Sequence, residues 1–166
     1  MLVGGALVFL VPAPVRRTGF FAVRGHRVFG VPRAAIRSLD VVLEERRFSA
    51  RRTGETWAID GRPASAATTD ALDDLLATLL GLRAVDAFRT RDAGSYGLDR
   101  PRATVTLATG EERRTLVLGD VNAAGTAFYA RRDRDPRILE IGTLLLSEIE
   151  RVFYTRDGPN HRPEIG

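Results

Sequence analysis

The side chains best suited to catalysis are scarce and scattered in this sequence. It contains two histidines, His26 among arginines and His161 in a polar tail, and it contains no cysteine. No His-x-x-x-His pair is present, so the common spacing of zinc ligands is missing, and no thiolate is available to hold a metal. A Ser-His-Asp triad would need a histidine in a packed site, and neither sequence context indicates packing. The sequence therefore predicts no enzymatic activity, no metal site and no cofactor.

Two pairs of aspartates are the remaining candidates for metal ligands. Asp73 and Asp74 are adjacent in a predicted helix, so their side chains lie about 100° apart around its axis and do not converge. Negative charge in the first turn of a helix is favourable in itself and explains both residues, and Thr68 or Thr69 is expected to cap this helix. Asp133 and Asp135 alternate with arginines, which is more typical of a neutralised charged turn than of a calcium loop.

The stretch Tyr-Gly-Leu-Asp-Arg-Pro at residues 96–101 is the best candidate for a specific contact. One interpretation is structural: Gly97 supplies a positive φ, Leu98 fills the core, the aspartate caps the turn and the proline directs the chain into the next strand. The other interpretation is functional, with Tyr96 and Asp99 contacting a partner protein. The sequence leaves both interpretations open.

All 25 basic residues are arginines, and the formal net charge is +4. The arginines are interspersed with 21 acidic residues along the chain and do not form a basic block, so no nucleic-acid partner is predicted. Codon usage in a GC-rich genome explains arginine without lysine, but guanidinium groups also bind phosphate and carboxylate well. The residues predicted to bind an anionic ligand, such as a lipid head group or an acidic glycan, are Arg16, Arg17, Arg24 and Arg27, with Arg47 and Arg51 in addition.

Residues 1–14 are apolar and uncharged. As a helix they would span roughly 20 Å, less than the roughly 30 Å of a bilayer core. They are interpreted either as the remnant of a membrane anchor that begins upstream of Met1 or as a buried edge strand, and the glycines and the Pro-Ala-Pro end favour the anchor. The basic and aromatic residues up to position 29 suit a membrane surface, or alternatively a lead-in strand whose aromatic side chains join the core. Residues 1–27 are therefore treated as an N-terminal segment.

Residues 28–156 are predicted to form one α+β domain of two related units. In residues 28–90, period-two alternation predicts three short strands, and apolar residues from Leu72 to Phe88 at spacings of three and four predict a helix. Residues 101–156 repeat the pattern as four strands and a helix that begins near Thr143. The two units, βββα and ββββα, have antiparallel sheets packed on amphipathic helices. Their sheets could pair edge to edge or sandwich the helices, and residues 157–166 are predicted to be a flexible tail.

Several of these features together resemble the bacterial domain of unknown function numbered 4340. They are Trp57 after a hairpin, the aspartate-led helix ending Leu-Leu-Gly-Leu-Arg, the Tyr-Gly-Leu-Asp-x-Pro connector, and Leu116-Val117-Leu118-Gly119 with Tyr129 downstream. The resemblance covers roughly Val28 to Tyr154. It implies an N-terminal transmembrane helix, a position outside the cytoplasm and, in some members, a link to accessory proteins of gliding-motility-type ABC transporters. It implies no catalytic residue.

The sequence thus predicts a non-enzymatic, membrane-associated module on the extracytoplasmic, periplasmic side. Its expected partners are other protein subunits of a membrane complex, and a membrane surface is a further candidate. Binding of an anionic ligand through the arginines is the alternative function.

Overall fold

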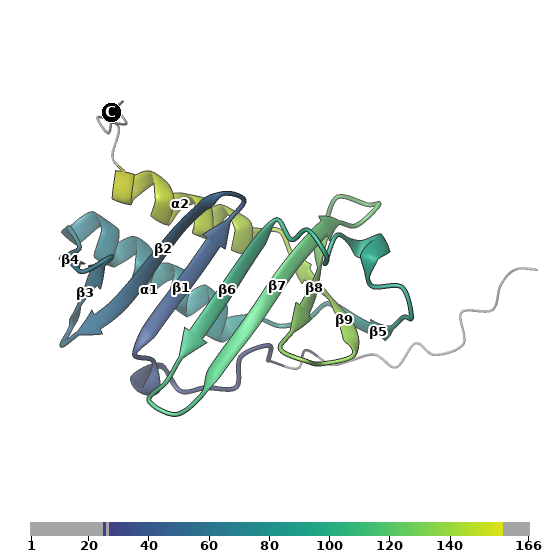
Figure 1. The fold of residues 1–166 in the computed structure, drawn as a ribbon, viewed down its shortest axis with the longest axis horizontal. Helices are drawn as coiled ribbons and strands as arrows, with labels where there is room; N and C mark the ends of the chain where they lie inside the picture. Colours follow the sequence, from purple (N-terminus) through teal and green to yellow (C-terminus); the bar gives the residue numbers. More distant parts are fainter. Residues whose placement is uncertain (1–24, 26, 158–166) are drawn as a thin grey trace, which may run out of the picture.

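The computed structural model of the protein describes residue 25 and residues 27–157 (Figure 1). Its strands are β1 (Ser38–Leu43), β2 (Arg46–Thr53), β3 (Thr56–Ile59), β4 (Arg62–Pro63), β5 (Asp86–Arg89), β6 (Ala103–Ala108), β7 (Arg113–Val121), β8 (Ala127–Arg132) and β9 (Arg137–Gly142). The α-helices are α1 (Ala66–Gly81) and α2 (Leu144–Asp157), and the short 3₁₀ helices are η1 (Arg33–Ala35) and η2 (Gly94–Tyr96).

All nine strands form one antiparallel sheet in the order β4-β3-β2-β1-β6-β7-β8-β9-β5. The α+β class is therefore confirmed. The two halves of the chain join edge to edge, because β1 pairs with β6 from Ser38 opposite Ala108 to Leu43 opposite Ala103. This pairing decides between the two arrangements that the sequence left open.

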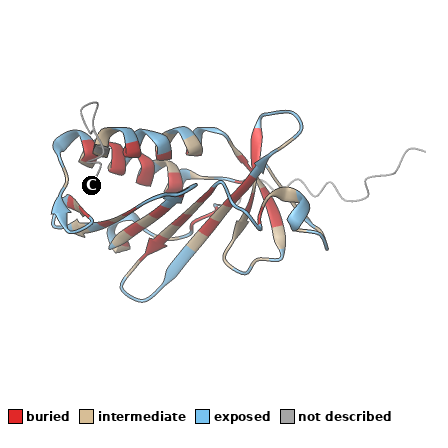
Figure 2. Cartoon of the chain, turned by 45° about the horizontal axis from the view of Figure 1, so that its top comes forward, coloured by how far each residue is buried: buried red, intermediate tan, exposed pale blue. Residues whose placement is uncertain are grey.

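Both α-helices lie on one face of the sheet (Figures 1 and 2). The inward-facing residues of α1 recur at helical spacing and are fully buried: Leu72, Leu75, Leu76 and Leu79. They meet alternating strand residues such as Leu39 and Val41, together with the apolar face of α2. The predicted burial of a leucine stripe against a hairpin-built sheet is confirmed for these residues. Trp57 and Phe29 also belong to this core.

The start of α1 differs from the prediction. Ser65, not Thr68 or Thr69, is the N-cap, and its hydroxyl oxygen accepts a hydrogen bond from the Thr68 N–H at 3.1 Å. The helix begins at Ala66, so the aspartates that were assigned to its first turn lie further along it. Asp73 instead binds the Trp57 Nε1–H at 3.1 Å, and Asp74 pairs with Arg151 of α2 at 2.5 Å. Side-chain partners therefore explain these aspartates, and the prediction that helix polarity explains them was wrong, because that effect is confined to the first turn.

The predicted helical stripe was wrong beyond residue 81. The chain leaves the helix at Gly81, Val85 is 69% exposed, and Phe88 lies in strand β5. This strand crosses to the far edge of the sheet and pairs with β9. The apolar spacing continues through the break, so periodicity alone could not locate it. The first unit also has more strands than the three predicted, because residues 62 and 63 form β4 and residues 86–89 form β5.

Candidate interaction surface

The face of the sheet opposite the helices is open over its central strands (Figure 2). Side chains alternate between the two faces of a strand, so residues that pair across neighbouring strands share a face. Val42 pairs with Arg47 and is 43% exposed, which places both on the open face. Thr104 pairs with Val117, and these two continue the same face onto β6 and β7.

The open face is polar and basic. Arg47, Arg51 and Arg113 occupy it, and Asp40 is the acidic residue among them. Asp40 accepts hydrogen bonds from the Ser49 hydroxyl at 2.6 Å and from an Arg113 guanidinium nitrogen at 2.9 Å. One acid is thus neutralised locally, and the face keeps an excess of positive charge.

The connector between β5 and β6 covers one end of this face. The Tyr96 ring packs against Phe88 with ring centroids 5.4 Å apart and against Tyr129 at 4.7 Å. Leu98 is 4% exposed, so it fills the space beneath the connector. Gly97 has a φ of 72° in the left-handed region, as the structural interpretation of this motif requires. Tyr96 is therefore part of an aromatic cluster that fixes the connector to the sheet.

Gly119 is the point of closest approach between the connector and β7. A Cβ atom at this position would lie 2.1 Å from the Tyr96 carbonyl oxygen and 3.0 Å from the Gly97 carbonyl carbon. The pairing of β7 with β8 shifts register between Leu118 and Val121, which is typical of a β-bulge. The Leu-Gly end of the strand and the Tyr-Gly-Leu-Asp connector are thus two halves of one contact.

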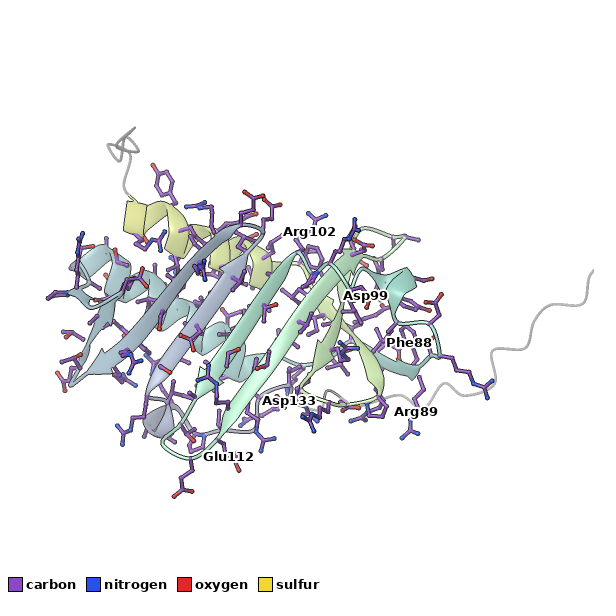
Figure 3. The ribbon with its side chains drawn as sticks, viewed as in Figure 1. Phe88, Arg89, Asp99, Arg102, Glu112 and Asp133 are labelled. Carbon is purple, nitrogen blue, oxygen red and sulfur yellow. The ribbon has the colours of Figure 1, made fainter. Side chains whose placement is uncertain are left out.

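Asp99 is exposed at the end of the sheet where the connector lies, whereas Glu112 and Asp133 lie at the opposite end (Figure 3). No hydrogen bond to Asp99 is found among the described residues, so the predicted turn cap is not this residue. Asp92 binds η2 instead, with its carboxylate accepting hydrogen bonds from the Ser95 hydroxyl and, at 3.3 Å, from the Ser95 N–H. These bonds lower the pKa of Asp92.

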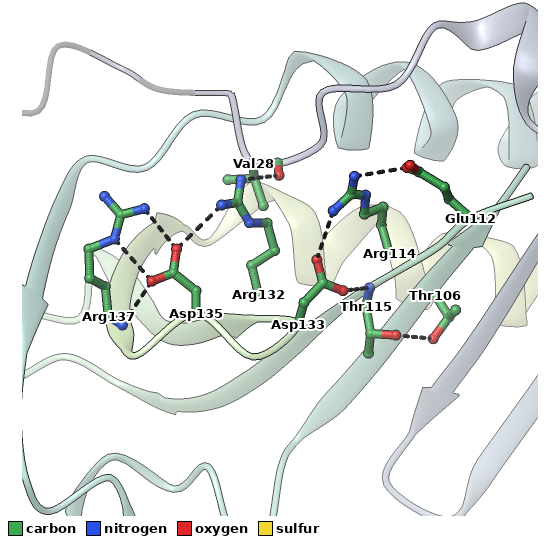
Figure 4. Close-up of polar contacts among 9 residues, drawn as sticks. All are labelled: Val28, Thr106, Glu112, Arg114, Thr115, Arg132, Asp133, Asp135 and Arg137. Carbon is green, nitrogen blue, oxygen red and sulfur yellow. Dashed lines mark hydrogen bonds and ion pairs between the residues drawn. The ribbon is translucent and has the colours of Figure 1, made fainter.

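The turn between β8 and β9 is the neutralised charged turn that the sequence predicted (Figure 4). Asp133 accepts the Thr115 N–H at 2.7 Å, and Asp135 binds the Arg137 guanidinium at 2.7 and 3.0 Å. Hydrogen bonds from Arg137 hold the pKa of Asp135 at about 2, although burial opposes this shift. Arg132 joins the turn to the N-terminal lead-in by donating to the Val28 carbonyl at 3.1 Å.

A hollow of about 710 Å³ lies between the β3–β4 hairpin, the start of α1 and the last turn of α2. Its charged and polar lining residues are Arg47, Asp60, Arg62, Ser65, Thr68 and Arg156. Sequence reasoning named only the first of these as a ligand-binding candidate. No local pattern could find the set, because its arginines come from three elements far apart in the chain.

Comparison with protein families places residues 57–151 in a family described as Domain of unknown function (DUF4340). The chain belongs to this family. No curated protein and no solved structure matches the chain. The DUF4340 segment begins at Trp57 and contains α1, the connector and strands β5 to β9. It therefore includes both halves of the Gly119 contact.

The predicted contact residues are not brought together. Tyr96 and Asp99 lie within the DUF4340 segment, with Tyr96 committed to the aromatic cluster and Asp99 free to face solvent. Arg27 is exposed and forms an isolated bridge with Arg83 near the end of α1. Arg16, Arg17 and Arg24 lie outside the described residues, as do the apolar residues 1–14, so the predicted anchor and basic patch stay predictions.

Among the described residues, no group of three or more histidine or acidic side chains is placed to hold a metal ion. No helix in this part of the chain is both long and apolar enough to cross a membrane.

Proposed function

We propose that this DUF4340 protein is a non-enzymatic interaction module that serves as a subunit or accessory of a larger membrane complex on the extracytoplasmic side. The observation that carries the proposal is the open face of the sheet, which presents Val42, Thr104 and Val117 between arginines. Interfaces between separately folded proteins are about as polar as the rest of the surface, and arginine is enriched in them.

The way in which the acidic residues are used supports a structural role for the domain. Asp40, Asp73, Asp133 and Asp135 each bind a side chain or backbone N–H of another element or turn residue. Their oxygens are thereby engaged in holding strands and turns in place. The apolar sequence of residues 1–14 supports membrane attachment, since it precedes a domain whose own apolar residues are largely used in the core.

The direct test is crosslinking in native cells, using the protein as encoded with any residues upstream of Met1. Photo-crosslinking amino acids would be placed on the open face at Val42 or Thr104 and, as matched controls, on the outer sides of the helices at Asp70 or Glu150, all of which are accessible. We expect the protein in the membrane fraction, with crosslinks to a defined protein from the open face only.

Two outcomes would contradict the proposal. Recovery as a soluble cytoplasmic monomer without crosslinks would refute the membrane-complex role. Crosslinks from the helical face alone would refute the assignment of the interaction surface.

A further inference from the structure

One hydrogen-bond donor of the hollow beside α1, Arg156, is held in place by other contacts. Arg156 donates to the Arg47 carbonyl oxygen at 2.9 Å, and its guanidinium lies 5.1 Å from the centre of the Phe153 ring. The Arg156 side chain is only 23% exposed. Because this arginine is already ordered, a ligand that it contacts would cost little additional side-chain entropy.

Asp60 is the one acidic residue among the described residues that line the hollow. Its Oδ1 accepts the Ser49 N–H at 3.0 Å, and its Oδ2 lies 3.6 Å from Arg156 Nη1. Both carboxylate oxygens are thus engaged at the edge of β2. This part of the edge lies beyond the last residue of β3 that pairs with β2. The carboxylate offsets part of the positive charge but leaves more guanidinium groups than acids around the hollow.

Arg62 adds a positive charge to the hollow that no acidic residue between positions 27 and 157 neutralises. It pairs with Ile59 across β3 and β4, and Ile59 is buried on the helix side of the sheet, so the Arg62 side chain projects to that side as well. Arg62 forms no ion pair with an acidic residue in the described part of the chain. A guanidinium at the wall of a hollow and without an acidic partner is suited to an incoming oxyanion.

The backbone of β2 adds a donor to the same space. The N–H and the carbonyl of Ser49 both bond to Asp60 across the edge of β2. Alternation along an antiparallel strand turns the N–H and carbonyl of Arg47 toward that same edge, and the carbonyl is the group that Arg156 binds. The Arg47 N–H therefore points toward the hollow beside the Arg156 guanidinium.

We propose that this hollow is a binding site for a phosphate group, held by Arg62 and Arg156 with the Arg47 N–H and the Ser65 hydroxyl at its wall. The proposal is independent of the interaction function of the open face. Two guanidinium forks and neutral donors match a tetrahedral oxyanion, and a volume of about 710 Å³ leaves room for the organic group that carries it. The phosphate could belong to a soluble ester or to a phospholipid head group.

The test uses the full chain and two kinds of probe. Glycerol 3-phosphate and inorganic phosphate are titrated while the backbone amides of Ser65 and Thr68 are followed by NMR. Flotation with phosphatidylcholine vesicles, with and without phosphatidic acid, tests a membrane source. We expect saturable shifts at these amides with the soluble probe, or flotation only with phosphatidic acid, and each outcome identifies one source.

Charge-matched variants separate a defined site from general attraction to a basic protein. Arg62→Gln should weaken binding about tenfold, as expected for the loss of a charged hydrogen-bonding partner. Arg51→Gln removes the same charge from the open face of the same sheet and should change affinity less than twofold. Arg156→Gln is informative only if circular dichroism shows a native fold, because Arg156 packs on Phe153; Arg62→Gln decides the question alone.

The proposal is overturned if neither probe binds. It is equally overturned if Arg51→Gln and Arg62→Gln weaken binding alike, since the attraction would then be non-specific.

Discussion

Replacing Gly119 by alanine should separate the connector from the sheet. The added methyl group would lie 2.1 Å from the Tyr96 carbonyl oxygen, a distance that real Cβ atoms do not adopt. The obstacle is backbone, which cannot rotate away as a side chain would. Either β7 or the connector must therefore move.

The cost can be worked out from the contacts that movement would break. Exposure of Leu98 would cost about 1.5–3 kcal/mol, and loss of the two ring pairs of Tyr96 would cost about 0.5–1.5 kcal/mol each. Partial relaxation keeps some of these contacts, so we expect a loss of about 3 kcal/mol in the free energy of unfolding. Small domains have about 5–15 kcal/mol in total, so this variant should fold but be clearly weakened.

Equilibrium unfolding in urea, followed by the fluorescence of the single tryptophan, measures this loss. Gly81→Ala is the control, because a Cβ there meets nothing within 4 Å and the residue closes a helix, where alanine is favoured by about 0.5–1 kcal/mol. The two glycine variants should thus move stability in opposite directions. A Gly119→Ala protein within about 0.5 kcal/mol of the parent would refute the close-contact argument.

Three further predictions concern side-chain contacts. Trp57→Phe should lower the free energy of unfolding by about 1–3 kcal/mol in a circular dichroism melt, because Asp73 loses its indole donor and the core loses volume. Asp135→Asn should lower the free energy of unfolding by up to about 2 kcal/mol at pH 7, since the folded pKa of about 2 lies below the unfolded value. The stabilisation by the Asp135 carboxylate is complete above about pH 4 and is lost as the pH falls through 2. Urea titrations at several pH values should therefore show the difference from the parent disappear at the acid end. Asp74→Asn should change the urea midpoint little, by less than about 1 kcal/mol, because the ion pair of Asp74 is solvent-exposed.

The sequence predicted the elements with local signals and missed those set by distant contacts. Leu72 to Leu79 showed the helix, and alternation showed the strands, because each pattern reflects burial of one face. The chain from Val85 to Phe88 continued the helical spacing by coincidence. Its true position depends on pairing with β9, about fifty residues away, which no short window of sequence reports. Gly81 is the last helical residue and has a low helix propensity, which was the local hint that the helix ends near it.

For the candidate functional residues, too, the sequence showed what local signals set and missed what distant contacts set. The connector was recognised because turn residues are readable from sequence, and the roles expected for Gly97 and Leu98 hold in the structure. The sequence assigned the turn cap to Asp99, but Asp92 is the aspartate that binds Ser95, and only the fold decides which of the two reaches it. The hollow with Arg62 and Arg156 could not be foreseen, since it exists only after the ends of α1 and α2 are packed together.

The connector also explains why the open face is polar. Its aromatic cluster covers the end of the sheet where Phe88 and Tyr129 would otherwise be exposed. The open face of the central strands carries threonine, serine, valine and arginine, which tolerate exposure to solvent. A face intended for permanent burial would be expected to carry a more apolar core. The aromatic end of the sheet is covered, whereas its centre is exposed to solvent and bordered by arginines. Under the proposed function, this favours a partner that binds to the domain after it has folded.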